Sequence, residues 1–197
     1  YKIKLLAIAK KDGDRIEARV HPTMVPETHP IAKVDGVYNA VFVDGDAVGS
    51  TMFYGSGAGM MATASAVAAD VLDISRNVLA GSVGRLKPLG YVEDAMKDVK
   101  IKDIDEVRCS YYLRFSVVDE PGVLSNISGA LGKNNISISS VIQKGRGSGG
   151  SVPLVIVTHS AYEKELKAAI GEIEQMDAIS EKIMIIRIEE NNDEESE

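Results

Sequence analysis

The chain of 197 residues is long enough for one large domain or two modest ones, and its 45% apolar content suffices for ordinary buried cores. Its net charge of −7 at pH 7, with basic residues scattered along the chain, excludes the electrostatic pattern of proteins that bind nucleic acid or anionic membranes. This composition favours small-molecule partners.

Cysteine content and hydropathy narrow the class further. The single cysteine, Cys109, has no second cysteine for an internal disulfide and no spaced cysteine or histidine companions for a metal site. No apolar run approaches the roughly 20 residues that a membrane helix needs. We therefore expect a protein of the reducing cytoplasm, with no metal, no membrane partner and no nucleic-acid partner. The sequence opens at Tyr1 inside a strand-like run, without methionine, and we interpret it as a fragment.

The first part of the chain reads as two hairpins and one helix. Strand-like apolar runs flank the turn signal KDGD at residues 11–14 and the turn signal VDGD at residues 43–46, which predicts a β-hairpin around each. From Met60 to Leu79 apolar residues recur at the spacing of one helix face, with alanines beside them. We expect this small face to pack closely against a sheet.

A change in composition separates this part from the next. Residues 81–106 mix glycine, proline and charge without a sustained period, which predicts a linker, interrupted by a short helix around Glu93 to Val99. Residues 107–189 follow the order strand, helix, strand, strand, helix, strand, which is the ferredoxin-like βαββαβ arrangement. The predicted fold class is α+β, with a mixed or antiparallel sheet and a packed helix over residues 1–80, followed by this ferredoxin-like domain.

Three local features belong to the second domain and its end. The glycine-rich run GRGSGG is predicted to join the two middle strands, and Ser160 with Glu163 predicts a capping box at the last helix. The acidic tail, residues 190–197, lacks apolar residues and is expected to be disordered. The predicted inward face of the last helix consists of Tyr162, Leu166, Ala169, Ile170 and Ile173.

The run GSGAG, residues 55–59, stands between a predicted strand and the start of the first helix. Glycines allow positive φ and let a ligand touch the backbone, while a helix start presents unpaired N–H groups with partial positive charge. The turn therefore suits an anion or a polarised amide. A tight turn that serves packing alone is the alternative. The spacing matches neither G-x-G-x-x-G nor the Walker loop, so neither standard phosphate motif is present.

The segments HPTMVPETHP, VYNAVFV and GSGAGMMATASAVAAD occur in this order between residues 21 and 70. They resemble the carboxy-terminal part of the catalytic domain of homoserine dehydrogenase, and the resemblance spans about residues 1–80. It implies that Gly57, Ala58 and Gly59 line a nicotinamide cofactor, NADP or NAD, held by an upstream Rossmann domain.

The resemblance also implies what the sequence lacks. The dinucleotide-binding domain, and the acidic residues and lysine that bind homoserine and move its proton, would lie before Tyr1. No catalytic residue is therefore assigned, and we expect the chain alone to be inactive. The parent would interconvert L-aspartate 4-semialdehyde and L-homoserine, in threonine and methionine biosynthesis. Family members often have proline where this sequence has Ser56 and Ala62, and the departure loosens the turn without removing a contact.

The segment VVDEPGVLSNISGALGKNNISISSVIQ, residues 117–143, resembles the ACT domain, an amino-acid-sensing module of many biosynthetic enzymes. Its turn offers a carboxylate to an ammonium group and first-turn amides to a carboxylate, which together suit a zwitterion. In that family effectors lie between this turn and a strand of a neighbouring ACT domain, so the resemblance implies a homodimer or higher homo-oligomer, with threonine as the effector. The effector-binding residues that it implies are Asp119, Gly122, Val123, Leu124, Asn135, Ile136 and Ser137.

Other interpretations stay open at the level of sequence. The PGVL run also marks a well-started helix, and many ACT domains serve only as dimerising platforms. The alternative function is a stand-alone amino-acid-sensing ACT module fused to an oligomerisation sheet. A third is another ACT-bearing enzyme, such as a phosphoglycerate dehydrogenase or an aspartokinase. His21 and His29 each precede proline and are interpreted as structural, hydrogen-bonded residues.

Overall fold

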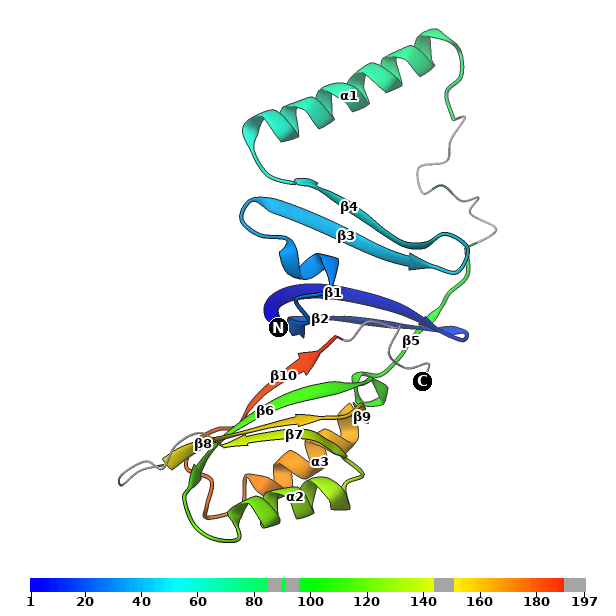
Figure 1. Ribbon diagram of the computed structural model, residues 1–197. Coiled ribbons are helices and arrows are strands. Elements are labelled where there is room, and N and C mark those ends of the chain that lie inside the picture. The colour runs from blue at the N-terminus through cyan, green and yellow to red at the C-terminus, as the bar shows by residue number, and fades with distance from the viewer. Residues whose placement is uncertain (85–89, 91–95, 144–150, 190–197) are drawn as a thin grey trace. The chain divides into compact units, whose positions relative to one another are not determined.

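The computed structural model describes residues 1–84, 90, 96–143 and 151–189 (Figure 1). Contacts divide the chain into two compact units, of which one joins Tyr1–Ala32 to Val99–Glu197 and the other is Lys33–Asp98. These units differ from the sequence segments 1–80 and 107–189, whose status as separate domains stays a prediction.

The first hairpin consists of β1, Lys2–Asp12, and β2, Arg15–Val25, paired antiparallel along their whole length. The tight turn between them contains Gly13 at φ 62°, a left-handed conformation that glycine adopts without strain. The hairpin predicted around KDGD is confirmed.

Four further strands of the same unit form an antiparallel sheet. The central strand β6, Arg108–Val118, lies between β10, Met184–Ile188, and β8, Ser151–Thr158. Strand β7, Ile138–Gln143, pairs with the other side of β8. With one helix after β6 and one after β8, this order confirms the predicted ferredoxin-like βαββαβ fold.

Helices α2, Val123–Lys133, and α3, Glu163–Ile173, cover one face of this sheet (Figure 1). Apolar residues recur at helical spacing on the two helices and at alternate positions along the strands. These two apolar faces pack against each other and exclude water from the core between them. Burial of each such side chain contributes about 1.5–3 kcal/mol relative to exposure. The largest fully buried side chains between the layers are Tyr111, Phe115, Leu113, Ile127, Leu131, Leu154, Ile156, Leu166 and Ile173.

The ferredoxin-like sheet continues into the first hairpin. Strand β10 pairs in parallel with β2, with Arg187 opposite Thr23 and Ile188 opposite Met24, which gives the strand order β1-β2-β10-β6-β8-β7. The short strand β5, Lys100–Ile101, also pairs in parallel with β2. The end of the predicted linker is therefore a strand of this sheet.

Three short elements complete this chain path. The 3-10 helix η1, Pro30–Lys33, follows the first hairpin, and η3, Ile104–Glu106, leads from β5 into β6. Strand β9, Ala161–Tyr162, pairs with the start of β6 and precedes α3.

The unit Lys33–Asp98 contains the second hairpin and the long helix. Strands β3, Tyr38–Gly45, and β4, Gly49–Ser56, pair antiparallel, and α1 spans Met60–Leu79, so the predicted hairpin and helix are confirmed. The expected packing of α1 differs, because none of its residues is buried among the described parts of the chain. Its apolar stripe, Val67, Val71, Ile74 and Val78, is exposed.

Two local predictions need correction, and others fall on residues that are not described. Helix α3 begins at Glu163, where Glu165 rather than Glu163 accepts a hydrogen bond from the N–H of Tyr162, so Ser160 is not its cap. Tyr162 is 40% exposed and lies outside the inward face, whereas Glu163 is buried. Residues 96–99 are not helical. Residues 91–95, the GRGSGG turn and the tail 190–197 lie outside the described residues.

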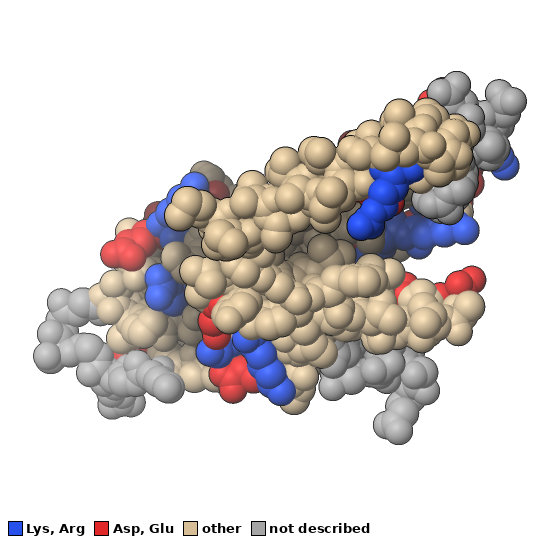
Figure 2. Space-filling model, turned by 90° about the horizontal axis from the view of Figure 1, so that it is seen from above, with Lys and Arg blue, Asp and Glu red and all other residues tan. Residues whose placement is uncertain are grey.

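The surface carries both signs of charge. Figure 2 shows a face on which uncharged residues predominate and basic side chains are scattered among acidic ones. Within the described ranges, no helix is both long and apolar enough to span a membrane.

Candidate functional site

The turn between β6 and α2, Asp119–Gly122, starts a helix in a conformation that needs glycine. Gly122 has φ 95° and is the N-cap of α2, and its carbonyl accepts the first helical hydrogen bond from Asn126 N at 2.9 Å. The N–H of Val123 donates to Glu120 O at 3.4 Å. Helix geometry leaves the next two amides, those of Leu124 and Ser125, without an acceptor inside the helix. Their partial positive charge favours an anionic ligand group.

A surface depression of about 460 Å³ lies beside this turn, within the size range of small-ligand sites. Asp119 is exposed at its edge and brings a carboxylate beside the open helix start. Gln143, at the end of β7, adds an amide, and Val117 and Leu154 add apolar surface. The depression thus brings together the chemical groups that a zwitterion with a short side chain requires.

Four of the predicted effector residues belong to this depression. Asp119, Gly122, Val123 and Leu124 all line it. Val123 is 8% exposed and packs into the core, whereas Leu124 is 40% exposed. Leu124 can therefore contact a ligand with both its amide and its side chain.

The other three predicted effector residues lie at the opposite end of α2. The helix has 11 residues, so its ends are about 16 Å apart at 1.5 Å per residue. Asn135 has φ 59° and donates from Nδ2 to Glu165 Oε1 at 3.5 Å, Ile136 is buried in the core, and the Ser137 carbonyl accepts from His159 N. One chain alone does not bring them to the turn.

The glycine turn before α1 is open to solvent. All five residues 55–59 are exposed. Gly59 is the N-cap of α1 with φ 131°, which favours glycine, and its carbonyl accepts from Thr63 N at 3.0 Å. Ser56 Oγ donates to Ala58 O at 3.0 Å and braces the turn.

The two outer glycines of the G-A-G turn are required for different reasons. A Cβ on Gly57 would lie 2.4 Å from Nδ2 of Asn39, so packing against β3 explains this glycine. A Cβ on Gly59 would meet nothing within 4 Å, so only its backbone angle and its open surroundings explain it. Bare first-turn amides next to Gly59 fit the polar amide or phosphate groups of a dinucleotide.

The two histidines are held by local hydrogen bonds, as predicted. His21 Nδ1 lies 3.0 Å from Thr23 Oγ1 and 3.1 Å from Pro22 O, and His29 Nδ1 accepts from Ile31 N at 3.1 Å. Burial lowers the pKa of both imidazoles below its ordinary value of 6.5.

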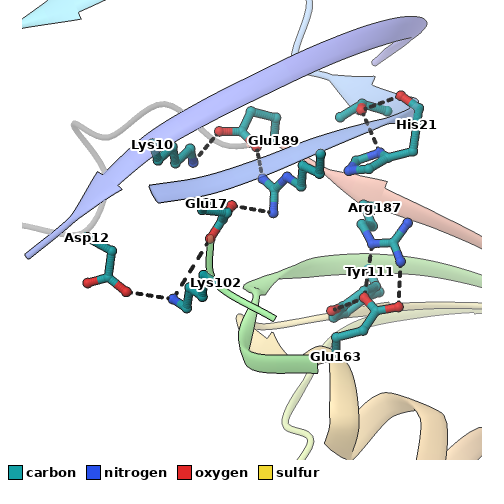
Figure 3. A network of polar contacts seen from close by, with 11 residues as sticks. Lys10, Asp12, Glu17, His21, Lys102, Tyr111, Glu163, Arg187 and Glu189 are labelled. Carbon is teal, nitrogen blue, oxygen red and sulfur yellow. Dashed lines mark hydrogen bonds and ion pairs between the residues drawn. The ribbon is translucent and has the colours of Figure 1, made fainter. Parts of the chain in front are cut away.

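Sequence reasoning missed a buried polar group around Glu163 (Figure 3). Its carboxylate accepts from Tyr111 Oη at 2.9 Å and from Arg187 Nε at 2.9 Å, with a second contact from Arg187 Nη2. Burial, followed by the neighbouring Cys109, raises the pKa of Tyr111 well above 10. Arg187 and Tyr111 are 24 and 52 positions away from Glu163 in the sequence, so no local pattern could have revealed this group.

A second missed group consists of charges between β1, β2 and the end of β10 (Figure 3). The side chain of Arg19 is 2% exposed and lies 2.8 Å from Glu17 Oε1 and 2.7 Å from Glu189 Oε2. Lys10 also contacts Glu189, and Lys102 lies 2.8 Å from Asp12. Among the described residues, no group of three or more His, Cys, Asp or Glu side chains is placed to hold a metal ion.

Comparison with known proteins identifies both parts of the chain. The family model for homoserine dehydrogenase matches residues 1–72, and the model for the ACT domain matches residues 111–178. Homoserine dehydrogenases of Neisseria gonorrhoeae and Pseudomonas aeruginosa are 46% and 41% identical over 193 residues, which is 98% of this chain and 44% of each of those proteins.

Solved structures agree with the sequence relatives. The crystal structure of a homoserine dehydrogenase from Thiobacillus denitrificans has a TM-score of 0.86 and 45% identity, over 96% of this chain and 43% of that one. A structure of the S. aureus enzyme at pH 7.0 has a TM-score of 0.59 and 26% identity, over 97% of this chain and 42% of that one. The chain spans less than half the length of the relatives that it matches. It corresponds to the carboxy-terminal region of the homoserine dehydrogenase family, a portion of the catalytic domain followed by an ACT domain.

Proposed function

We propose that this chain is the effector-binding and assembly part of a homoserine dehydrogenase, and that the turn from Asp119 to Leu124 binds L-threonine. The observation that carries the proposal is the left-handed Gly122, which starts α2 beside an exposed carboxylate and a depression of about 460 Å³. The ligand carboxylate would accept from the amides of Leu124 and Ser125, and its ammonium group would donate to Asp119.

A second copy of the chain completes this site in the proposal. Asn135, Ile136 and Ser137 lie about 16 Å from the turn of their own chain, at the far end of α2. Two antiparallel copies would bring the turn of each to the segment 135–137 of the other. The unpaired edge of β7, the end strand of the sheet, offers backbone groups for such an association.

Isothermal titration calorimetry with L-threonine tests this function. Wild-type chain should bind L-threonine, and Asp119→Asn, which removes the acceptor charge with little change of shape, should weaken binding by about tenfold or more, since hydrogen bonds to charged groups contribute about 1.5–3 kcal/mol. Asp46→Asn makes the same chemical change at an exposed aspartate in the turn between β3 and β4, outside the depression, and is the matched control. Equal affinities of the wild type and Asp119→Asn would refute the assignment of the ammonium group to Asp119.

The dehydrogenase activity belongs to the proposal as well. We assign Gly57, Ala58 and Gly59 to contacts with NADP or NAD, which supplies hydride transfer between L-aspartate 4-semialdehyde and L-homoserine when bound. The chain covers 44% of its relatives, and we propose that catalysis needs the remainder, so the chain alone should show no activity.

A pair of glycine substitutions in a full-length enzyme that contains this chain tests the cofactor contact. Gly59→Val should raise the KM for the cofactor or lower kcat, because a side chain would occupy the open space at the start of α1. Gly49→Val is the control, because Gly49 also has positive φ, at 71°, but lies at the start of β4, the opposite end of this strand from residues 57–59. If the kinetic constants change equally in both variants, the effect comes from backbone strain and not from a lost cofactor contact.

The environment of the single cysteine supports a cytoplasmic location. Cys109 is buried, and burial raises the pKa of its thiol to about 11, so it is protected from disulfide exchange and fits a reducing cytoplasm.

The exposed apolar stripe of α1 and the exposed Val41 and Phe53 of the second hairpin favour association with another chain or segment. We propose a homodimer or higher homo-oligomer.

A further inference from the structure

The strand β10 belongs to two elements at once. It pairs antiparallel with β6 over five residues, from Met184 opposite Arg114 to Ile188 opposite Ser110, inside the ACT sheet. Its other edge pairs in parallel with β2, and the N–H of Glu189 donates to Met24 O at 3.0 Å, which extends this ladder by one residue. The backbone ladder therefore runs without a break from the ACT sheet into the first hairpin.

Three residues, one on each of β6, β10 and β2, lie in register across these neighbouring strands. Tyr111, Arg187 and Thr23 are consecutive register partners on β6, β10 and β2, and Arg187 also pairs with the buried Glu163 at the start of α3. Thr23 is 1% exposed. Arg187 thus contacts α3 through its side chain and is paired with the hairpin strand β2 through its strand.

Glu189 is the charged link between β10 and the hairpin (Figure 3). Its two carboxylate oxygens contact Lys10 on β1 and Arg19 on β2, and the Arg19 side chain is almost wholly buried. Separation of the hairpin from β10 would leave Arg19 with Glu17 alone. Separation would break the contacts of Glu189 with Lys10 and Arg19, so these charge-assisted contacts favour the joined state.

The hairpin has little stability of its own to retain after separation. An isolated two-stranded hairpin is at best marginally stable in water. Val25 and Ile188, at 1% and 2% exposure, are buried where the hairpin and β10 meet. When the hairpin separates from β10, these apolar side chains become exposed. The hydrogen bonds between the strands and the ion pair of Glu189 are lost in the same step.

We propose that the hairpin β1–β2, which matches the catalytic family, and the ACT sheet form one cooperative unit, in which Glu189 couples the hairpin to the effector turn. A ligand that binds the folded unit stabilises every part that unfolds with it, by linkage. Amino-acid binding at Asp119–Leu124 would then stabilise the hairpin without contact between them. The ligand step rests on the proposed function, whereas the cooperative unit does not.

Native-state hydrogen exchange of the whole chain, followed by mass spectrometry across a urea series, tests the cooperative unit without any ligand. Amides of β2 and of β8 should exchange with the same opening free energy and the same urea dependence. Opening of β2 at a clearly lower free energy and with a small urea dependence would overturn the proposal.

Two matched variants test the role of Glu189. Glu189→Gln should lower the hydrogen-exchange protection of the β2 amides about tenfold relative to that of the β8 amides. This factor corresponds to the loss of one hydrogen bond to a charged group. Glu172→Gln makes the same chemical change in an exposed pair with Lys133 inside the ACT unit, and it should leave the ratio of β2 to β8 protection unchanged. An unchanged ratio in Glu189→Gln would overturn the assignment.

The same exchange measurement with L-threonine tests the regulatory step. L-threonine should raise the protection of β2 and β8 by the same factor in the wild type, and should raise β8 more than β2 in Glu189→Gln. Protection of β8 alone in the wild type would overturn the coupling. No protection anywhere would instead refute threonine as the ligand, while the urea series would still decide the cooperative unit.

Discussion

At the scale of single residues, Gly122 and Glu163 show two different ways in which a position is constrained. Gly122 is fixed by its backbone, since a φ of 95° strains any residue with a Cβ. Glu163 is fixed by its partners, Tyr111 and Arg187, since an unpaired buried carboxylate would be costly. The glycine was predictable from the PGVL run at a helix start, whereas the partners of Glu163 come from distant parts of the chain.

Alanine at two glycines of α2 separates backbone strain from helix propensity. Gly122→Ala should lower the free energy of unfolding by about 1–2 kcal/mol, because the left-handed region disfavours a Cβ. Gly129→Ala lies inside the helix, where a Cβ meets nothing within 4 Å, and should raise stability by about 0.5–1 kcal/mol. Urea unfolding followed by circular dichroism measures both. Equal effects would contradict the assigned conformation of Gly122.

The half-buried His21 predicts a loss of stability toward acid. Burial lowers the folded-state pKa of His21, so below about pH 6.5 the unfolded chain binds a proton that the folded chain does not. The free energy of unfolding should therefore fall as the pH falls from 7.5 to about 5.5. His29 contributes in the same direction.

Replacement of His21 shows how much of this pH dependence of the free energy of unfolding comes from His21. His21→Gln should make the decline between pH 7.5 and about 5.5 shallower in urea unfolding experiments. A decline as steep as that of the wild type would mean that the protonation of His21 does not differ between the folded and unfolded states.

At the scale of elements, helices α1 and α2 have similar amphipathic patterns and opposite surroundings. Ile127 of α2 is fully buried against the ACT sheet, and Ile74 of α1 is 61% exposed. Periodicity predicted that both helices form and which face of each is apolar. It could not predict what covers that face, because the partner of a helix is not a local property of its sequence.

The same substitution in the two helices tests this contrast. Ile127→Ala should destabilise the chain by about 2–5 kcal/mol, since it leaves a cavity in a packed core. In the monomeric chain, at a protein concentration too low for association, Ile74→Ala should change stability by less than about 0.5 kcal/mol, as expected for an exposed position. Thermal or urea unfolding distinguishes the two. A comparable loss in Ile74→Ala would show that α1 is covered in solution.

Local signals also set the limits of the strand predictions. Turn signals located both hairpins, and the order of strand-like and helical segments indicated the ACT fold, because each depends on neighbours in sequence. The pairing of β10 with β2 joins residues 164 positions apart, such as Thr23 and Arg187, and carries no local signal. The helix start was misplaced because S-A-Y-E fits the Ser/Thr-x-x-Glu capping pattern, whereas the observed N-cap is Tyr162, a residue type outside that pattern, and Glu163 is buried.

At the scale of the whole chain, the two halves of the proposed effector site lie at opposite ends of α2. Four of the seven predicted residues line one depression, and three lie about 16 Å away. The sequence therefore proposed both segments but did not predict their separation, which follows from the length of the helix between them. A site that uses both segments requires two chains.

This requirement predicts that ligand binding and association are coupled. L-threonine should shift the chain toward a dimer in sedimentation velocity experiments, by mass action on the species that binds it. Ile142→Lys, on the exposed edge strand β7, should weaken both association and binding, because it places a charge at the edge where the copies would pair. Full binding by a strictly monomeric variant would contradict the two-chain site.

The most direct measurement is the backbone amide NMR spectrum of the chain titrated with L-threonine. If the start of α2 holds the ligand carboxylate, the largest shifts should appear at the amides from Gly122 to Ser125, and Asp119→Asn should abolish them at the same concentration. Saturating L-threonine that leaves these amides unmoved, or shifts only residues remote from the turn, would contradict the proposed effector site.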